Sequence, residues 1–282
     1  MGSIPTWSSI IKFRAKGELK IGGDYINIVY VFSPNWFRYF LIACFALFST
    51  NPGPIKVYLI SDSLQPKQIQ LLQNLCDKFG KGYEIIYIGI EEDIFTDINI
   101  DTTYYTKYTL YRLLIPMLIQ EEKILYLDAD TLVCQDIRDL YKTNMKDNLI
   151  AGAQEIFMTK THKESIGLEN RDKYVNAGVL LMNLDEFRNH SLDKKMIELA
   201  NTEHFLYHDQ CILNKVSKGK VLYINKMYNV SIVTWKNLNP VRSEIKIIHY
   251  VGKKQPWVQG LPLARLWIEW KDKWDKFFIA NF

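Results

Sequence analysis

Residues 123–130 read KILYLDAD and place two carboxylates directly after a short apolar run. The run, Lys123 to Leu127, has the length and composition of a strand that is buried on both faces. Because side chains two residues apart on a strand point the same way, Asp128 and Asp130 can reach one cation. Mg²⁺ and Mn²⁺ prefer such oxygen ligands and often join them to substrate phosphates. The octapeptide therefore predicts a metal–diphosphate site, with capping of the next turn as the plainer alternative.

The segments before this strand predict the rest of a sheet. Strands are predicted at residues 25–32, 56–60 and 83–88, with helices after 33–35 and at 63–79 and 106–119. This alternation is typical of an α/β fold with a mainly parallel central sheet and helices on both faces. Such sheets bind ligands beyond the carboxyl ends of their strands, where Asp128 lies. No Gly-x-Gly-x-x-Gly follows the first strand, which counts against a dinucleotide site.

Composition excludes several classes of function. The chain has 282 residues, enough for one large α/β domain or two small ones, and a net charge of +4. That charge is too small to indicate a nucleic-acid partner, and we expect none. The cysteines lack metal-ligand spacing and predict buried free thiols in a reducing compartment: Cys44, Cys76, Cys134 and Cys211. With no signal peptide, and with the apolar run 39–48 too short to span a bilayer, we expect a cytoplasmic protein.

Three later segments carry further polar residues of interest. They are residues 173–184 (KYVNAGVLLMNL), 208–214 (HDQCILN) and 245–257 (IKIIHYVGKKQPW). The first has small residues that let backbone approach a ligand. The second begins a helix with Asp209 in its first turn, and a strand in the third ends at His249. Taken singly, these two residues have plainer interpretations, as a helix cap and a hydrogen-bonded core histidine.

Taken in order, LYLDADTLV, VNAGVLLMNL, HDQCILN and HYVGKKQPW resemble glycosyltransferase family 8. This family includes bacterial lipopolysaccharide galactosyl- and glucosyltransferases and glycogenin. The resemblance runs from Tyr25 to Trp257 and implies a GT-A-like nucleotide-sugar-binding fold with retaining transfer of a hexose. We accordingly divide the chain into a loosely attached leader (1–23), a catalytic domain (24–257) and a C-terminal aromatic and basic segment (258–282).

The resemblance also implies roles for individual residues. Asp128, Asp130 and His249 would ligate Mn²⁺, or Mg²⁺, and the ion would bridge the diphosphate of the donor. Mn²⁺ tolerates an imidazole among oxygen ligands better than Mg²⁺ does. Besides the two aspartates, the residues that would contact the donor are Asn35, Arg112, Asn176, Gly252 and Lys254.

Asp209 and Gln210 match the family pair that lies beneath the reacting sugar. Retention by double displacement needs a nucleophile on the far side of the anomeric carbon, as in retaining glycosidases. Gln210 matches the position that faces this carbon, but an amide is a poor nucleophile, and Asp209 is expected to hold sugar hydroxyls. We therefore predict same-face attack by the acceptor through an oxocarbenium-like state, with Gln210 stabilising the positive charge.

Two positions depart from the family pattern. Where the family has a lysine for the diphosphate, this chain has Gln255, so either Lys253 or Lys254 substitutes or phosphate binding is weaker. Ser33 replaces an acid that reads uracil, although Asn35 matches the family asparagine. We keep a UDP-sugar as the expected donor, with glucose or galactose as the sugar. The expected acceptor is a saccharide, such as a lipopolysaccharide or other bacterial surface-glycan precursor, with a lipid-linked form as one option.

The C-terminal segment combines aromatic residues at helical spacing with lysines. They are Trp267, Trp270, Trp274 and Phe277, with Lys271, Lys273 and Lys276. Such a helix suits the surface of an anionic bilayer, and it would make the protein peripheral on the inner face of the cytoplasmic membrane. A last helix that packs on the catalytic domain has the same periodicity and is the alternative.

Two other functions stay open on the sequence. Asp128-Ala129-Asp130-Thr131 also fits the Asp-x-Asp-x-Thr of haloacid-dehalogenase phosphatases, in which Asp128 would be the phosphorylated nucleophile. That family places its motif in the first strand and ends with an acidic Mg²⁺ pair, which we do not find. A sugar-nucleotide or glycan-binding module without turnover is the second alternative, supported only by Gln255 and Ser33.

Overall fold

The structure is a computed structural model that describes residues 7–14, 25–62, 64–90, 95, 107–251 and 263–282. Its strands are β1 Trp7–Arg14, β2 Ile26–Val31, β3 Ile55–Ser61, β4 Tyr83–Ile90, β5 Lys123–Asp128, β6 Thr131–Val133, β7 Ile150–Gln154, β8 Val175–Asn183, β9 Val221–Tyr223 and β10 Ile247–His249. Its α-helices are α1 Phe37–Thr50, α2 Pro66–Phe79, α3 Lys107–Tyr111, α4 Ile115–Leu118, α5 Arg138–Tyr141, α6 Lys160–Ser165, α7 Leu184–Asn189, α8 Leu192–Thr202, α9 His208–Val216, α10 Ile232–Leu238 and α11 Ala264–Asn281. Short 3₁₀ helices are η1 Pro34–Trp36, η2 Arg112–Leu114, η3 Lys226–Tyr228 and η4 Arg242–Glu244.

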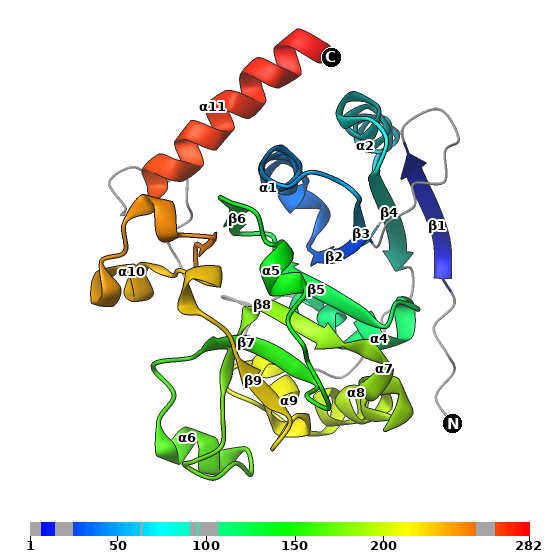
Figure 1. The fold of residues 1–282 in the computed structure, drawn as a ribbon. Helices are drawn as coiled ribbons and strands as arrows, with labels where there is room; N and C mark the ends of the chain where they lie inside the picture. The colour runs from blue at the N-terminus through cyan, green and yellow to red at the C-terminus, as the bar shows by residue number, and fades with distance from the viewer. Residues whose placement is uncertain (1–6, 15–24, 63, 91–94, 96–106, 252–262) are drawn as a thin grey trace.

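Within the described residues, one large sheet organises the molecule (Figure 1), in the order β1-β4-β3-β2-β5-β8-β7-β9. Strands β4, β3, β2 and β5 are parallel to one another, and β7 and β9 form a further parallel pair. Strand β1 runs antiparallel to β4, and β8 runs antiparallel to both of its neighbours. The predicted α/β fold with a mainly parallel central sheet is confirmed.

Both faces of the sheet are covered because successive side chains of the central strands point to opposite layers. On one side, Ile28 and Tyr30 of β2 belong to a core that includes residues of α1, α2 and α11. On the other side, Val29 and Val31 belong to a core that includes residues of α3, α7, α8 and α9. Nearly continuous apolar strands are what a sheet buried on both sides requires. The prediction of helices on both faces is therefore confirmed as well.

Two elements differ from the sequence predictions. The helix predicted at 106–119 is divided into α3, η2 and α4, and Pro116 lies in the first turn of α4, where its missing N–H is tolerated. Residues 7–14 fall within the segment 1–23, which was expected to be a loosely attached leader. These residues form β1, which pairs antiparallel with the outer edge of β4.

A second, two-stranded sheet positions the histidine predicted as a metal ligand. Strands β6 and β10 are antiparallel, and their register pairs His249 with Thr131. The N–H of Tyr250 also donates to the carbonyl of Asp130 at 3.0 Å. These backbone contacts bring His249 next to the turn that carries Asp130, although the two residues are far apart in the sequence.

The C-terminal helix α11 uses its aromatic face inside the protein. Trp267, Trp270 and Trp274 are 1, 9 and 7% exposed. Phe45 of α1 packs edge-on against both Trp270 and Trp274, at ring-centroid distances of 6.0 and 5.6 Å. For this face, the alternative of a helix packed on the domain is confirmed. Among the described helices, none has the length and apolar character needed to cross a bilayer.

Candidate active site

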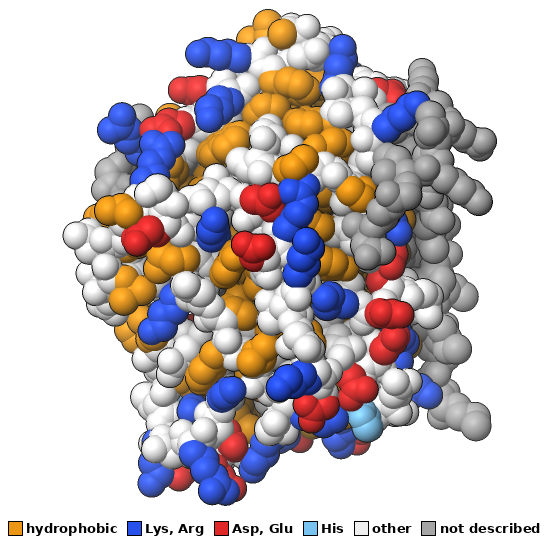
Figure 2. All heavy atoms as spheres, in the orientation of Figure 1, with side chains coloured by type: hydrophobic (Ala, Val, Ile, Leu, Met, Phe, Trp, Pro, Cys, Tyr) orange, Lys and Arg blue, Asp and Glu red, His pale blue; other side chains and the backbone are white. Residues whose placement is uncertain are grey.

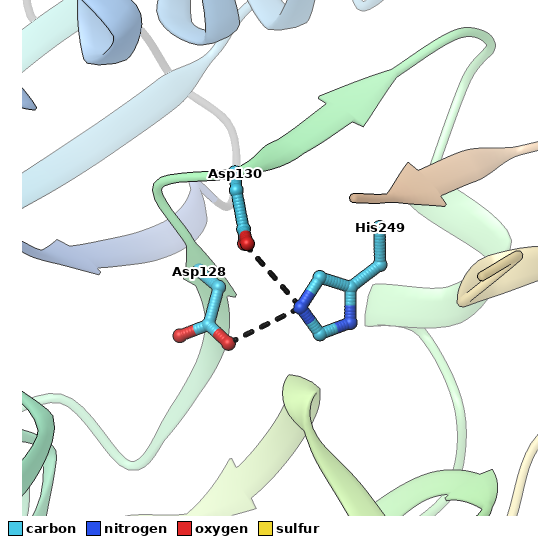
Figure 3. A group of neighbouring side chains, drawn as sticks. All are labelled: Asp128, Asp130 and His249. Carbon is cyan, nitrogen blue, oxygen red and sulfur yellow. Dashed lines mark ion pairs between the residues drawn. The ribbon is translucent and has the colours of Figure 1, made fainter. Parts of the chain in front are cut away.

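Asp128, Asp130 and His249 converge at the carboxyl end of β5 (Figure 3). Nε2 of His249 lies 3.4 Å from Oδ2 of Asp128 and 3.3 Å from Oδ1 of Asp130. One ligand atom from each of the three residues lies within 4.8 Å of the others. Two carboxylate oxygens and one imidazole nitrogen are a donor set that suits a divalent cation such as Mn²⁺. The structure thus brings together the three residues that were predicted as metal ligands.

The electrostatics of this cluster favour positive charge. Burial alone would lower the pKa of His249, but the two aspartates outweigh it and raise that pKa to about 10. Burial alone would raise the pKa of Asp128, but Arg112 and His249 bring it down to about 2. Asp128 therefore stays ionised, and the imidazole beside the two aspartates keeps its proton, at the place where a metal cation would bind.

Arg112 ties this cluster to a second acid. Its side chain is buried, Nη2 donates to Oδ1 of Asp128 at 2.7 Å, and Nε lies 2.9 Å from Oδ2 of Asp209. Nη1 donates to the carbonyl of Ala177 at 2.9 Å. The guanidinium also lies over the ring of Tyr126, whose hydroxyl donates to Asp128. Each nitrogen of the guanidinium therefore has a partner in the protein, and its predicted contact with the donor stays a prediction.

Helix α9 places Asp209 and Gln210 beside this arginine. Asp209 is buried, and burial raises its pKa to about 7 against the opposite effect of Arg112. The amide of Gln210 is held at both ends, since Oε1 accepts from the N–H of Ala177 at 2.9 Å and Nε2 donates to the hydroxyl of Tyr174 at 3.5 Å. Asp209 is thus more than a helix cap, and Gln210 has a defined orientation next to the ion-pair network.

Asn176 lies at the start of β8 and is linked to the metal cluster through Asn229. Its Nδ2 donates to Oε2 of Glu155 at 3.0 Å, and its Oδ1 accepts from the N–H of Gly178 at 3.0 Å. The same Oδ1 accepts from Nδ2 of Asn229 at 2.9 Å. Oδ1 of Asn229 lies 3.0 Å from Nδ1 of His249. Neither Asn229 nor Glu155 was identified from the sequence.

Gly178 makes room for the imidazole. A Cβ atom built on this residue would lie 1.9 Å from Cε1 of His249, a separation that atoms cannot adopt. The small residue predicted to allow a close backbone approach is therefore needed at this position, and here it accommodates the ring of a metal-ligand candidate.

The remaining predicted donor contacts are placed less directly. Asn35 is exposed and follows β2, whose Val31 pairs with Asp128, so it lies at the same edge of the sheet as the cluster. Gly252 and Lys254 lie outside the described residues, as does the substituted position Gln255.

The sequence model of glycosyl transferase family 8 matches residues 27–260, most of the chain. The chain belongs to glycosyltransferase family 8. This glycosyltransferase is 25% identical over 222 residues to general stress protein A of Bacillus subtilis, which covers 72% of this chain and 76% of that protein. It is 24% identical over 278 residues to lipopolysaccharide 1,3-galactosyltransferase of Salmonella typhimurium, which covers 92% of this chain and 82% of that enzyme.

Solved structures show the same fold. The crystal structure of galactosyltransferase LgtC in complex with donor and acceptor sugar analogs matches the glycosyltransferase with a TM-score of 0.77 at 24% identity. The match covers 88% of this chain and 96% of LgtC. The predicted GT-A-like fold and family resemblance are confirmed, and the phosphatase and binding-module alternatives are set aside.

Proposed function

We propose that this glycosyltransferase is a retaining, Mn²⁺-dependent hexosyltransferase that moves glucose or galactose from a UDP-sugar to a saccharide. The observation that carries this proposal is the convergence of Asp128, Asp130 and His249 at one strand end. Arg112 bonds Asp128 and Asp209 into the same network. A bound cation would neutralise the charge that builds up on the departing nucleoside diphosphate.

The buried arginine holds the acids that the reaction needs. Because Arg112 contacts both Asp128 and Asp209, it fixes one carboxylate toward the metal cluster and the other toward α9. A guanidinium suits this task since its nitrogens lie in one rigid plane. Asp209, held in this way, is positioned to accept hydrogen bonds from hydroxyls of the donor sugar.

Gln210 supports retention without forming a covalent bond. After it accepts from the N–H of Ala177, its amide oxygen keeps a second lone pair. That lone pair would stabilise positive charge at the anomeric carbon, while the acceptor hydroxyl attacks from the face that the diphosphate leaves and passes its proton to the departing phosphate. A glycosyl adduct trapped on Asp209 or Gln210 would contradict this mechanism.

For the acceptor we propose a lipopolysaccharide or other surface-glycan precursor, including a lipid-linked one. The similarity to lipopolysaccharide 1,3-galactosyltransferase of Salmonella typhimurium supports this class. So does the likeness to the LgtC structure, which was solved with donor and acceptor sugar analogs. We take the two hexoses together because they differ in the orientation of one hydroxyl group, which a few contacts discriminate.

We further propose that the protein acts in the cytoplasm, at the inner face of the membrane. The tryptophans of α11 are used in packing, but Phe278, Ile279 and Phe282 at its end are 39, 82 and 41% exposed. Figure 2 shows hydrophobic side chains with lysine and arginine beside them at the upper end of the molecule, where Figure 1 places the end of α11.

We expect Ile279→Ser combined with Phe282→Ser to reduce binding to anionic vesicles. Replacing the exposed Leu206 by Ser is the control, and unchanged binding of the double variant would contradict the membrane role.

The test of the proposed activity is release of UDP from a panel of UDP-sugars without an acceptor. We expect slow turnover of UDP-glucose or UDP-galactose with Mn²⁺, and none with EDTA. Turnover that persists in EDTA would contradict the metal dependence. Failure of every UDP-sugar to be bound or hydrolysed would show that Gln255 and Ser33 have changed the nucleotide or removed the activity.

A further inference from the structure

A chain of side-chain amides connects the metal cluster to the residue predicted to bind the donor sugar. It runs from His249 through Asn229 to Asn176 and ends on Glu155. Asn229 is 4% exposed and lies between η3 and the isolated bridge residue Val230, so its position is set by the fold. Asn176 and Glu155 are partly buried, and Asn176 also accepts from the backbone N–H of Gly178, so the network is tied to the main chain.

The direction of each hydrogen bond in this chain of side chains follows from the partners of Asn176. The backbone N–H of Gly178 can only donate, and Glu155 lies on the other side of the Asn176 amide group. Oδ1 of Asn176 must therefore face Gly178, and Nδ2 must face Glu155. Since Oδ1 of Asn176 can only accept, Asn229 must present its Nδ2 to it, 2.9 Å away.

The orientation of Asn229 then determines the state of the histidine. With its Nδ2 turned to Asn176, Asn229 presents Oδ1 to Nδ1 of His249 at 3.0 Å. Because an amide oxygen can only accept, Nδ1 carries a proton. When Nε2 gives up its proton, as metal binding requires, the lone pair of the neutral ring is on this nitrogen, which lies beside Asp128 and Asp130.

We propose that Asn229 is a positioning residue that fixes Nε2 of His249 as the metal-binding nitrogen and couples the metal cluster to Asn176. The proposal rests on the proposed function, in which His249 binds Mn²⁺ and Asn176 contacts the donor sugar. Partners on the second nitrogen of a metal-binding histidine orient the ring, and their loss typically lowers metal affinity about 10- to 100-fold. Gly178 contributes to the same arrangement, because it bonds Asn176 and leaves space for the imidazole.

Calorimetric titration of Mn²⁺ into the full chain is the first test. We expect Asn229→Ala to weaken Mn²⁺ binding about 10-fold or more. Asn51→Ala is the matched control, since Asn51 is also buried and bonds the carbonyl of Leu47 and the N–H of Ile137. It should lower the melting temperature without changing Mn²⁺ affinity. Unchanged Mn²⁺ affinity in Asn229→Ala would overturn the proposal.

Asn229→Asp tests the contact with His249 and the contact with Asn176 separately. It also provides a second variant in case Asn229→Ala fails to fold. Its carboxylate still accepts from Nδ1 of His249, so Mn²⁺ affinity should stay close to that of the unmodified protein. It offers no donor to Asn176, so the KM for the UDP-sugar should rise about fivefold, the effect of one lost hydrogen bond. Unchanged KM and kcat in this variant would overturn the coupling to Asn176.

Nuclear magnetic resonance of ¹⁵N-labelled histidines gives a readout that needs neither metal nor activity. The chain has five histidines, and the signal of His249 can be assigned with His249→Gln. Without metal the imidazole is protonated on both nitrogens, and we expect Asn229 to protect its Nδ1 proton from exchange with solvent, so that this proton exchanges rapidly in Asn229→Ala. Absence of this protected proton from the unmodified protein would overturn the proposal. If the unmodified protein shows this proton but binds no Mn²⁺, the proposed function fails; if it binds Mn²⁺ and Asn229→Ala behaves identically, only the role of Asn229 fails.

Discussion

The layer between α1 and α11 and the ion pair of Arg112 with Asp209 are both buried, but one is apolar and the other is charged. The first packs the rings of Trp270 and Trp274 against Phe45, and the second encloses the charges of Arg112 and Asp209. Burying rings stabilises the fold in proportion to apolar area, so another large ring can take the place of the first. Burying charges costs desolvation and is tolerated only while each charge keeps its partner. A substitution of similar shape should therefore largely preserve stability in the first region but lower activity in the second.

Asp130→Ala should have the largest effect, because it removes a ligand from the metal cluster. We expect UDP-sugar turnover to fall about 10²- to 10³-fold, the size of loss seen when one group that stabilises charge in the transition state is removed. The exposed Asp147 offers the matched control, and Asp147→Ala should keep full turnover. The measurement is UDP release at saturating Mn²⁺. Activity of Asp130→Ala near that of Asp147→Ala would contradict the role of the cluster.

Arg112→Lys tests whether charge alone is enough in the polar region. A lysine keeps the positive charge but cannot bond Asp128, Asp209 and the carbonyl of Ala177 together. We expect turnover to fall about 100-fold, as a displacement of about 1 Å in a reacting group commonly does. Arg171→Lys is the control, since Arg171 pairs with Glu169 at an exposed site. Wild-type kcat in Arg112→Lys would show that the geometry of the guanidinium does not matter.

Trp270 tests the apolar region in the same way. Trp270→Ala should lower the free energy of unfolding by about 3–5 kcal/mol, because it leaves a cavity beside Phe45. Trp270→Phe should lose clearly less, since a ring remains, and both variants should bind Mn²⁺ as the unmodified protein does while folded. Urea unfolding measures the first effect and calorimetry the second. A loss of Mn²⁺ affinity in folded Trp270→Phe would contradict the separation of the two regions.

The smallest effect is expected at the exposed end of α11. Ile279 is 82% exposed, so Ile279→Ser should change the free energy of unfolding by less than about 0.5 kcal/mol. Urea unfolding of Ile279→Ser and Trp270→Ala under the same conditions checks this contrast within one helix. A loss as large as that of Trp270→Ala would mean that Ile279 is covered in solution.

The sequence predicted the parts of the site that lie within one element. The apolar run ending in Asp128 and Asp130, and Asp209 in the first turn of a helix, follow from local patterns. The position of His249 depends on the pairing of β10 with β6, and only the family resemblance indicated it. Asn229 gave no signal, because a single asparagine in a loop has no periodicity and its role depends on its contacts with two other segments of the chain, at Asn176 and His249.

In the fold too, the elements specified by their own sequence were predicted, and what depends on distant residues was missed or left open. Central strands such as β2 and β5 were predicted because burial on both faces makes them continuously apolar. Strand β1 was missed, since an edge strand is specified by the edge of β4 that it pairs with as much as by its own residues. The aromatic face of α11 was predicted correctly, but its periodicity cannot distinguish a membrane from the surface of α1 as the apolar partner.

The most direct test of the central claim is calorimetric titration of Mn²⁺ into the protein in the presence of UDP. If Asp128, Asp130 and His249 form the metal site that serves the donor diphosphate, the protein should bind one Mn²⁺ per chain. Binding should strengthen with UDP and be lost in Asp128→Asn. Absence of Mn²⁺ binding, or binding that Asp128→Asn leaves intact, would contradict the claim.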